Sequence, residues 1–140
     1  SGGWEVRVPN LIPESHRDLL REDVKAFAFL ATTMPDGSPQ VTPLWFDVEG
    51  EFVWVNTGRG RTKDRNMAAR PKVALAIIDP ANPYRYMQIR GTVVETREQG
   101  AVEDIRRLSR KYRGTPDFDV PSGQVRVTIC IRPDHVSAQG

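Results

Sequence analysis

Hydrophobic and polar residues alternate most regularly close to the end of the chain. Between residues 124 and 132 every second position is valine or isoleucine, and Arg126, Thr128, Cys130 and Arg132 are interleaved with them. A period of two residues is typical of a strand with one buried face, so we predict a half-buried strand there. Shorter alternating or continuous apolar runs, bounded by turn residues, predict five further strands. These strands span residues 27–33, 40–48, 52–57, 73–78 and 86–96.

Helical spacing of apolar residues is clearest between residues 98 and 113. Apolar positions recur there at intervals of three or four residues, and Gly114 follows as a stop signal, so we predict a helix. Two shorter helices are expected, over residues 13–22, where a proline suits the first turn, and over residues 62–70, which end before Pro71.

Six strands joined mostly by short turns indicate a mainly β protein, and we predict a six-stranded antiparallel barrel with about three helices. The chain has 140 residues, of which 39% are hydrophobic and 27% charged. This balance suits one buried core and excludes a disordered or collagen-like chain. We expect one domain over residues 1–140, with residues 1–3 as the remnant of a cleaved tag.

Cysteine content and hydropathy bear on where the protein works. Cys130 is the single cysteine, so no internal disulfide can form. No run approaches the roughly 18 apolar residues that a membrane span needs. We therefore expect a cytoplasmic protein without a membrane span.

Positive charge is concentrated in one short segment. The whole chain carries +2, whereas residues 59–72 contain six basic residues against Asp64 alone, a local charge of +5. The six are Arg59, Arg61, Lys63, Arg65, Arg70 and Lys72. Such concentration favours a local anionic ligand over a nucleic acid, whose binding surface would spread its charge over a face.

The residues around this charge suit a phosphate group. Glycines at positions 58 and 60 let the backbone come close to an anion. Thr57 and Thr62 can donate hydroxyl hydrogen bonds, and the N–H groups of the first helical turn point outward. We interpret the segment as a phosphate site, with a solvated basic helix as the alternative. It is not a Walker A loop, because neither glycine is followed by lysine.

Two further segments could contact a planar ligand. Pro43 removes a backbone donor inside a predicted strand, which suits an edge strand with free backbone groups. The alternative is an edge strand that only packs its two aromatic residues into the core. Tyr84 and Tyr86 flank Arg85, an arrangement that suits either a planar anionic ligand or a subunit interface.

The sequence contains neither a metal-ligand pattern nor a serine-nucleophile motif. His16 and His135 stand alone without the spacing of zinc ligands, and no Gly-x-Ser-x-Gly sequence is present. Cys130 is interpreted as a packing residue rather than a reactive thiol. If the protein is an enzyme, a bound cofactor supplies the chemistry.

The order of these segments resembles a known superfamily. The residues that carry the resemblance are the hairpin of residues 28–33 and 43–46, the strand end Asn56-Thr57, the helix start Arg61-Thr62-Lys63-Asp64-Arg65-Asn66-Met67, and Pro71-Lys72-Val73-Ala74-Leu75. Over nearly its whole length the chain is similar to the pyridoxamine phosphate oxidase-like superfamily of FMN-binding-like split β-barrels. It resembles in particular the compact branch that uses the deazaflavin coenzyme F-420.

The resemblance implies a set of cofactor-binding residues. The phosphate would be held by Thr57, Arg61, Thr62 and Lys63, supported by Arg59 and Asn66. The ring would lie along residues 41–45 of the strand segment Gln40, Val41, Thr42, Pro43, Leu44 and Trp45. Two protomers build each site in this family, so Tyr84, Tyr86 and Gln88 of one chain would lie near the cofactor of the other in a homodimer.

The resemblance also implies an activity. Reduced coenzyme F-420 would give a hydride to a conjugated small-molecule substrate, with Tyr86 as a candidate proton donor. The alternatives are an FMN-dependent oxidase or flavin reductase, and a non-catalytic flavin- or deazaflavin-binding protein. The charge of residues 59–72 favours the deazaflavin, whose phosphodiester and oligoglutamate tail carry more negative charge than FMN.

Oxidation of vitamin B6 is not expected. The vitamin B6 oxidases of the superfamily carry a C-terminal Arg-x-His motif that binds the substrate phosphate. Here the corresponding stretch is Arg132-Pro133-Asp134-His135, which has one residue too many between arginine and histidine.

Overall fold

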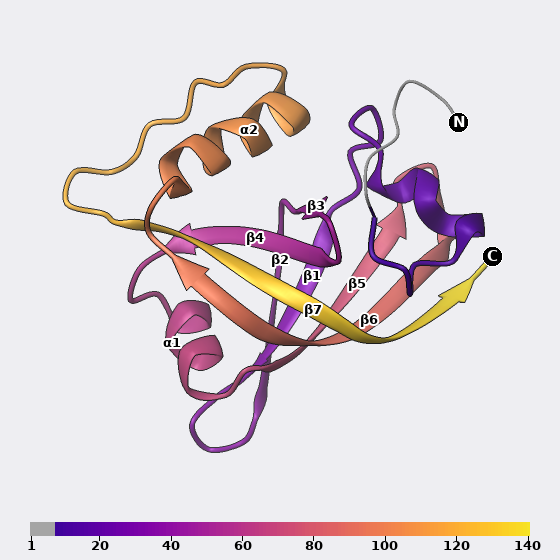
Figure 1. Ribbon diagram of the computed structural model, residues 1–140, viewed down its shortest axis with the longest axis horizontal. Helices are drawn as coiled ribbons and strands as arrows, with labels where there is room; N and C mark the ends of the chain where they lie inside the picture. Colours follow the sequence, from indigo (N-terminus) through magenta and orange to yellow (C-terminus); the bar gives the residue numbers. More distant parts are fainter. Residues whose placement is uncertain (1–7) are drawn as a thin grey trace.

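The computed structural model describes residues 8–140 and shows a bent antiparallel sheet with helices at both ends (Figure 1). The expected tag remnant, residues 1–3, lies outside the described residues. The helices are the 3-10 helix η1 (Glu14–Leu20), α1 (Thr62–Ala69) and α2 (Ala101–Arg113). The strands are β1 (Ala28–Thr33), β2 (Pro39–Leu44), β3 (Asp47–Glu49), β4 (Phe52–Gly58), β5 (Lys72–Asp79), β6 (Asn82–Arg97) and β7 (Arg126–Gln139).

The strand order is β2-β1-β5-β6-β7-β4-β3, and every neighbouring pair is antiparallel. β6 and β7, with 16 and 14 residues, are the long strands that link the two halves of the sheet (Figure 1). β2 and β3 are the edges, so the barrel is split rather than closed. The predicted mainly β, antiparallel split-barrel class with three helices is confirmed.

The described sheet has seven strands where six were predicted, because the predicted strand 40–48 is two strands. β2 ends at Leu44, and β3 begins at Asp47. Phe46, between them, is fully buried in the core. A core side chain at this point turns the chain inward and interrupts the edge strand. The edge position predicted from Pro43 is confirmed.

β7 was predicted to be half-buried, and this was wrong. Arg126, Thr128 and Cys130 are all buried, like the apolar residues between them. Their face is covered by α2, whose Ile105 packs in one cluster with Cys130. The alternation shows only which residues are polar and which are apolar, so it does not reveal that a helix covers the polar face.

β7 also continues past Pro133, whereas the predicted strand ends at Arg132. Its register against β6 shifts here, because Gly91 pairs with Pro133 and the next pair joins Arg90 to His135. A bulge of this kind tolerates a proline within a sheet. The close backbone approach expected at Gly91 is confirmed, since a Cβ there would lie 2.7 Å from the carbonyl oxygen of Arg132.

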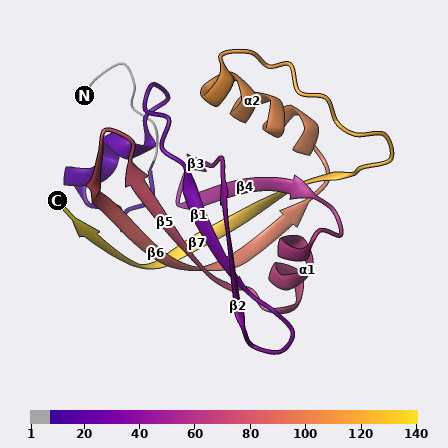
Figure 2. The ribbon, with the colours of Figure 1, turned by 180° about the vertical axis from the view of Figure 1, so that it is seen from behind.

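The helices lie at opposite ends of the sheet. Figure 2 shows α1 and α2 at one end and η1, beside the C terminus, at the other. α2 begins at Ala101, later than predicted, because Gly100 has a φ of 78° that a helix cannot continue. The helix predicted over residues 13–22 is the shorter 3-10 helix η1.

Two clusters of buried side chains hold the fold together. The main cluster lies between the two halves of the sheet and includes Leu30, Leu75 and Ile129, each at most 1% exposed. The second cluster joins α2 to β4 and β7 through Trp54 and Leu108. Each fully buried aliphatic side chain contributes about 1.5–3 kcal/mol to folding.

Candidate cofactor-binding cleft

A cleft of about 340 Å³ opens at the end of the sheet where α1 and α2 lie. It is formed by the end of β2, the end of β4 with the start of α1, one face of α2, and the start of β7. Its lining residues are Phe27, Pro43, Leu44, Trp45, Asn56, Thr57, Arg61, Lys63, Ile105, Leu108, Phe118 and Arg126. The cleft therefore joins two segments that the sequence singled out separately, the strand end at Trp45 and the basic segment after Thr57.

Arg61, Lys63 and Arg126 supply the positive charge of this cleft. Burial lowers the pKa of the Lys63 ammonium, and the charges of Arg61 and Arg126 lower it further. Burial and the nearby Arg61 lower the pKa of Arg126 in the same way. Within residues 8–140, none of the three has a carboxylate at ion-pair distance. A bound anion would relieve this mutual repulsion.

The turn between β4 and α1 positions two of these cations. Gly60 adopts a φ of 86°, which favours glycine, and its N–H donates to Oδ2 of Asp64 at 2.8 Å. Asp64 is buried in the first turn of α1, where a carboxylate also suits the helix dipole. The turn therefore places Arg61 and Lys63 at the N-terminal end of α1.

Arg126 is a cleft residue that the sequence interpretation missed. It is 9% exposed, and it donates from Nε to Oδ1 of Asn56 at 2.9 Å and from Nη1 to Oε1 of Gln124 at 2.8 Å. Its guanidinium carbon lies 5.3 Å from the centroid of the Phe118 ring. These contacts orient Arg126 without neutralising it. Finding it would have required the pairing of β7 with β4, which joins Arg126 to Gly58 and is not readable from the sequence pattern.

Aromatic side chains form another wall of the cleft. Trp45 stacks on Tyr112 with 5.4 Å between ring centroids and 4° between ring planes, and Phe118 meets Trp45 edge-on at 6.4 Å. The Tyr112 hydroxyl donates to the carbonyl oxygen of Ala26, and burial raises the pKa of Tyr112. Tyr112 is thus part of the scaffold and holds the half-buried Trp45 in one orientation.

Three of the predicted phosphate-site residues do not line the cleft. Arg59 forms an ion pair with Glu98 at 2.9 Å on the surface. Asn66 is buried and donates from Nδ2 to Oγ1 of Thr32 at 3.0 Å, which ties α1 to β1. Thr62 is the first residue of α1. In the structure Arg59 and Asn66 make contacts within the fold, whereas Thr57, Arg61 and Lys63 line the cleft.

The predicted ring-binding segment is divided between the cleft and the sheet. Pro43, Leu44 and Trp45 line the cleft. The other three residues do not: the Gln40 side chain accepts a hydrogen bond from the Thr32 hydroxyl, Val41 is 62% exposed, and the Thr42 Oγ1 is buried with no hydrogen-bond partner among the described residues.

The residues expected to serve a second protomer lie outside the cleft of their own chain. Tyr84, 85% exposed, Tyr86, 37% exposed, and Gln88 occupy the outer face of β6. Arg85 between the tyrosines is bonded by Asp18 at 2.6 Å, so it is engaged within its own chain. For this segment the ligand site and the subunit interface both stay predictions.

The described part of the chain contains no group of three or more potential metal ligands. His16 is buried and hydrogen-bonded, with Nε2 2.7 Å from the carbonyl oxygen of Gln139. Burial raises the pKa of the Cys130 thiol, which lies under α2. None of the helices between residues 8 and 140 is long and apolar enough to cross a membrane.

Comparison with known proteins agrees with the split-barrel architecture. The sequence profile of pyridoxamine 5'-phosphate oxidase matches residues 12–140. The chain belongs to the pyridoxamine 5'-phosphate oxidase family. The family resemblance drawn from the sequence motifs is therefore confirmed. No curated protein matches the chain.

Several solved structures are similar to this family member. An F-420 reductase is 36% identical, covers 90% of this chain and 98% of its own, and superposes with a TM-score of 0.79. The protein Rv2991 from Mycobacterium tuberculosis is 21% identical, with coverages of 96% and 89% and a TM-score of 0.68. General Stress Protein 26 from Bacillus anthracis is 18% identical, with coverages of 89% and 94% and a TM-score of 0.63. The last two similarities show the fold alone.

The cleft of this family member fits a planar cofactor that carries a phosphate. Three convergent cations and the Thr57 hydroxyl suit the phosphate. Trp45 and Phe118 offer aromatic surface, and the edge position of β2 leaves backbone groups unpaired along one side of that strand. The cleft therefore contains groups for both parts of such a cofactor: cations for the phosphate, and aromatic and backbone groups for the ring.

The residues that correspond to the Arg-x-His motif, Arg132 to His135, form the bulge of β7. Arg132 donates from Nε to Oδ1 of Asp134 at 3.0 Å. Asp134 is the extra residue of the β7 bulge, and His135 after it pairs with Arg90 of β6. The bulge separates Arg132 from His135, which is consistent with the extra residue noted in the sequence.

Proposed function

We propose that this protein is an oxidoreductase that uses the deazaflavin coenzyme F-420 to reduce a conjugated small molecule. The observation that carries the proposal is the cleft in which Arg61, Lys63 and Arg126 meet without an acidic partner among the described residues. Similarity to an F-420 reductase over 90% of the chain supports it. FMN is the second candidate, because the same cations also suit a phosphate monoester.

The chain's own residues would hold and orient the cofactor. Lys63, Arg61 and Arg126 would bind the phosphate, and the Thr57 hydroxyl would donate a hydrogen bond to it. The backbone of residues 41–45 at the open edge of β2, together with Trp45, would hold the ring. When bound, coenzyme F-420 supplies a hydride for transfer to the substrate. The protein's part is to fix the two molecules at reacting distance and to exclude water.

The proton that accompanies reduction needs a source, and the tyrosines differ in their suitability. Tyr112 is unsuitable because its hydroxyl is bonded to the backbone and its pKa is raised by burial. Tyr86 is the candidate donor, since it is 37% exposed on the outer face of β6. It would act in the cleft of the second protomer, with water as the alternative source.

We also propose that the protein works as a homodimer that joins the outer sheet faces of two copies. Phe29, 37% exposed, pairs with Pro43 of β2 and with Ala76 of β5 on this face. The same face carries Tyr84 and Tyr86. An exposed apolar face of this kind marks a protein interface, and it would bring the partner's β6 to the cleft.

The experiment that tests this function is anaerobic turnover. Reduced F-420 is mixed with the protein and a panel of enones, quinones and tetrapyrroles, and oxidation of the deazaflavin is followed by absorbance. We expect turnover with at least one conjugated substrate, and Lys63→Ala should raise the KM for the cofactor while Lys25→Ala leaves it unchanged. Binding without turnover across the panel would favour a carrier, and turnover with FMN alone would favour the flavin branch.

A further inference from the structure

A chain of buried hydrogen bonds runs from α2 through β7 to Arg126, one of the cations of the cleft. Thr128 lies at its centre, fully buried on the part of β7 that α2 covers, and it does not line the cleft. Its hydroxyl donates to Oδ2 of Asp104 at 2.8 Å and accepts from Nδ2 of Asn56 at 3.1 Å. Oδ1 of Asn56 then accepts from Nε of Arg126 at 2.9 Å. A single side chain therefore connects Thr128 to Arg126.

Asp104 anchors the far end of this chain. It is 6% exposed in the first turn of α2. Arg97 lies 3.0 Å and Arg107 3.3 Å from its carboxylate, in addition to the Thr128 hydroxyl. A hydroxyl that donates to a carboxylate becomes a better acceptor itself, because hydrogen bonds in a chain polarise one another. Asp104 thus strengthens the bond that Thr128 accepts from Asn56.

The contacts of Asn56 determine which way its amide points. Nδ2 has two acceptors, the Thr128 hydroxyl and the carbonyl oxygen of Ala101 at 2.8 Å. Oδ1 is therefore the atom that faces Arg126, since a rotated amide would place a donor against the Nε–H of Arg126. A neutral amide oxygen orients the guanidinium and leaves its charge unpaired, whereas a carboxylate at this position would form an ion pair with it. Arg126 keeps its charge for a ligand in the cleft.

We propose that Thr128 is a positioning residue for the phosphate of the cofactor. Through Asn56 it holds the guanidinium of Arg126 in one orientation in the cleft, without touching the ligand itself. An oriented side chain binds an oxyanion more tightly than a mobile one, because less conformational entropy is lost on binding. The inference rests on the proposed function, since it requires that the phosphate binds at Arg126.

Fluorescence titrations of Thr128→Val with two deazaflavins test this role. One ligand is coenzyme F-420, and the other is 8-hydroxy-5-deazariboflavin, which has the same ring but neither the phosphate nor the glutamate tail. The substitution removes the hydroxyl and leaves Nδ2 of Asn56 with the carbonyl oxygen of Ala101. We expect F-420 to bind about tenfold more weakly and the phosphate-free compound to bind as before, because only the phosphate depends on Arg126. A general loosening of the cleft would weaken both.

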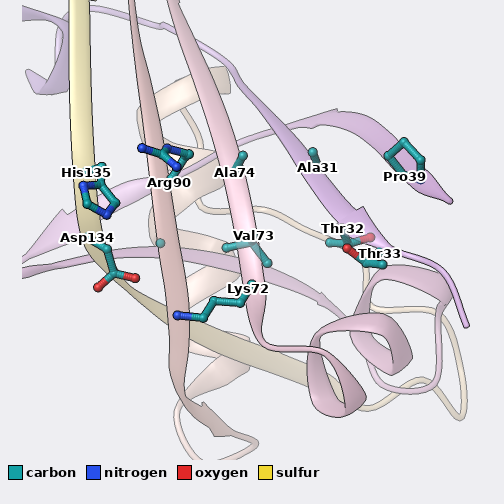
Figure 3. A pocket seen from close by; sticks show the side chains of 11 residues that line it. Ala31, Thr32, Thr33, Pro39, Lys72, Val73, Ala74, Arg90, Asp134 and His135 are labelled. Carbon is teal, nitrogen blue, oxygen red and sulfur yellow. The ribbon is translucent and has the colours of Figure 1, made fainter. Parts of the chain in front are cut away.

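Three further variants separate positioning from a merely structural role. Thr128→Ser keeps the hydroxyl and should bind F-420 like the wild type. Arg126→Ala should weaken F-420 binding, and Thr128→Val added to it should have no further effect, because the cation that Thr128 orients is gone. Thr92→Val is the matched control and should change neither affinity. Its hydroxyl donates to Oδ2 of Asp134 at 2.6 Å, and Asp134 lines the pocket on the outer face of the sheet that Figure 3 shows, not the cleft.

The Nε–H of Arg126 provides a measurement that needs neither a variant nor a cofactor. In the isotope-labelled wild type it should exchange with solvent more slowly by NMR than the Nε–H of the exposed Arg106. Equal exchange of the two would overturn the inference. So would a folded Thr128→Val that binds F-420 like the wild type, or that loses affinity for both deazaflavins alike. A wild type that binds neither deazaflavin would overturn the proposed function itself, and the inference with it.

Discussion

Lys63 is the residue whose surroundings depart most clearly from those of a surface lysine. It is half-buried beside two arginines, and burial and both neighbouring charges lower its pKa. These are the conditions in which a bound phosphate stabilises the charged form. The ammonium is therefore positioned for a ligand rather than for a partner within the fold.

Replacing Lys63 with alanine should weaken cofactor binding by about 1.5–3 kcal/mol, the usual contribution of a hydrogen bond to a charged group. Isothermal titration of the wild type and the variant measures the difference. Lys25→Ala, which removes an exposed lysine, serves as the control. Equal affinities of wild type and Lys63→Ala would remove Lys63 from the phosphate site.

Lys111 is a buried charge that the proposed function does not use. Its side chain is 1% exposed, and Nζ lies 3.8 Å from Oδ1 of Asp47 without a hydrogen-bond partner among the described residues. The rings of Phe46 and Tyr112 lie 5.1 and 5.3 Å away. Burial lowers the pKa of Lys111 below the ordinary 10.5, so the charged form costs folding free energy.

Lys111→Met should raise the free energy of unfolding at pH 7 by about 1 kcal/mol, because methionine fills a similar volume without a charge to desolvate. Below the lowered pKa both folded and unfolded wild type hold the proton, and the cost is fully present. Between that pKa and 10.5 only the unfolded state holds it, so wild-type stability rises with pH. The advantage of the variant should therefore shrink as the pH approaches 10.5.

Guanidinium unfolding of both proteins at pH 7 and at pH 10 measures this difference. Lys25→Met, at an exposed position, should show no comparable gain. A Lys111→Met variant that is less stable than the wild type at pH 7 would mean that the contacts with Asp47 and the two rings outweigh the desolvation cost.

Among the secondary-structure elements, α2 determines both the second core cluster and one side of the cleft. Leu108, 1% exposed, packs with Trp54 and Cys130 and also lines the cleft. Removing its side chain should leave a cavity that loosens α2. The shape of the cleft should change as well, because Ile105 on the same helix also lines it.

Leu108→Ala should cost about 2–5 kcal/mol of stability, and it should also weaken cofactor binding where the variant is still folded. Leu30→Ala is the matched control, since Leu30 is fully buried in the main cluster and does not line the cleft. Thermal unfolding and cofactor titration at 15 °C below each Tm compare the two. A similar loss of affinity in both variants would show that the effect is general rather than local to α2.

Elements with strong local signals were predictable, and those fixed by packing were not. The helix start at Thr62 and the bulge at Gly91 follow from local chemistry, and the sequence motif around Lys63 located one half of the cleft. The break at Phe46 and the burial of Arg126 depend on which surfaces α2 and the core cover. No periodicity along the chain reports those tertiary contacts.

For the molecule as a whole, the proposed dimer makes a prediction about size. The wild type should sediment at about twice the chain mass of 15.8 kDa. Phe29→Glu places a charge on the outer sheet face, and it should shift the protein toward the monomer. Phe52→Glu is the control, because Phe52 is 38% exposed on β4, away from that face. A monomeric wild type, or equal effects of both substitutions, would contradict the interface.

Coenzyme F-420 should bind in the cleft in preference to FMN, because the three cations there match its larger negative charge. A pair of titrations at one fixed salt concentration, with F-420 in one and FMN in the other, measures this preference through cofactor fluorescence. We expect saturable, tighter binding of F-420, weakened in Lys63→Ala. Tighter binding of FMN would assign the protein to the flavin-dependent part of its family, and binding of neither would contradict the phosphate site itself.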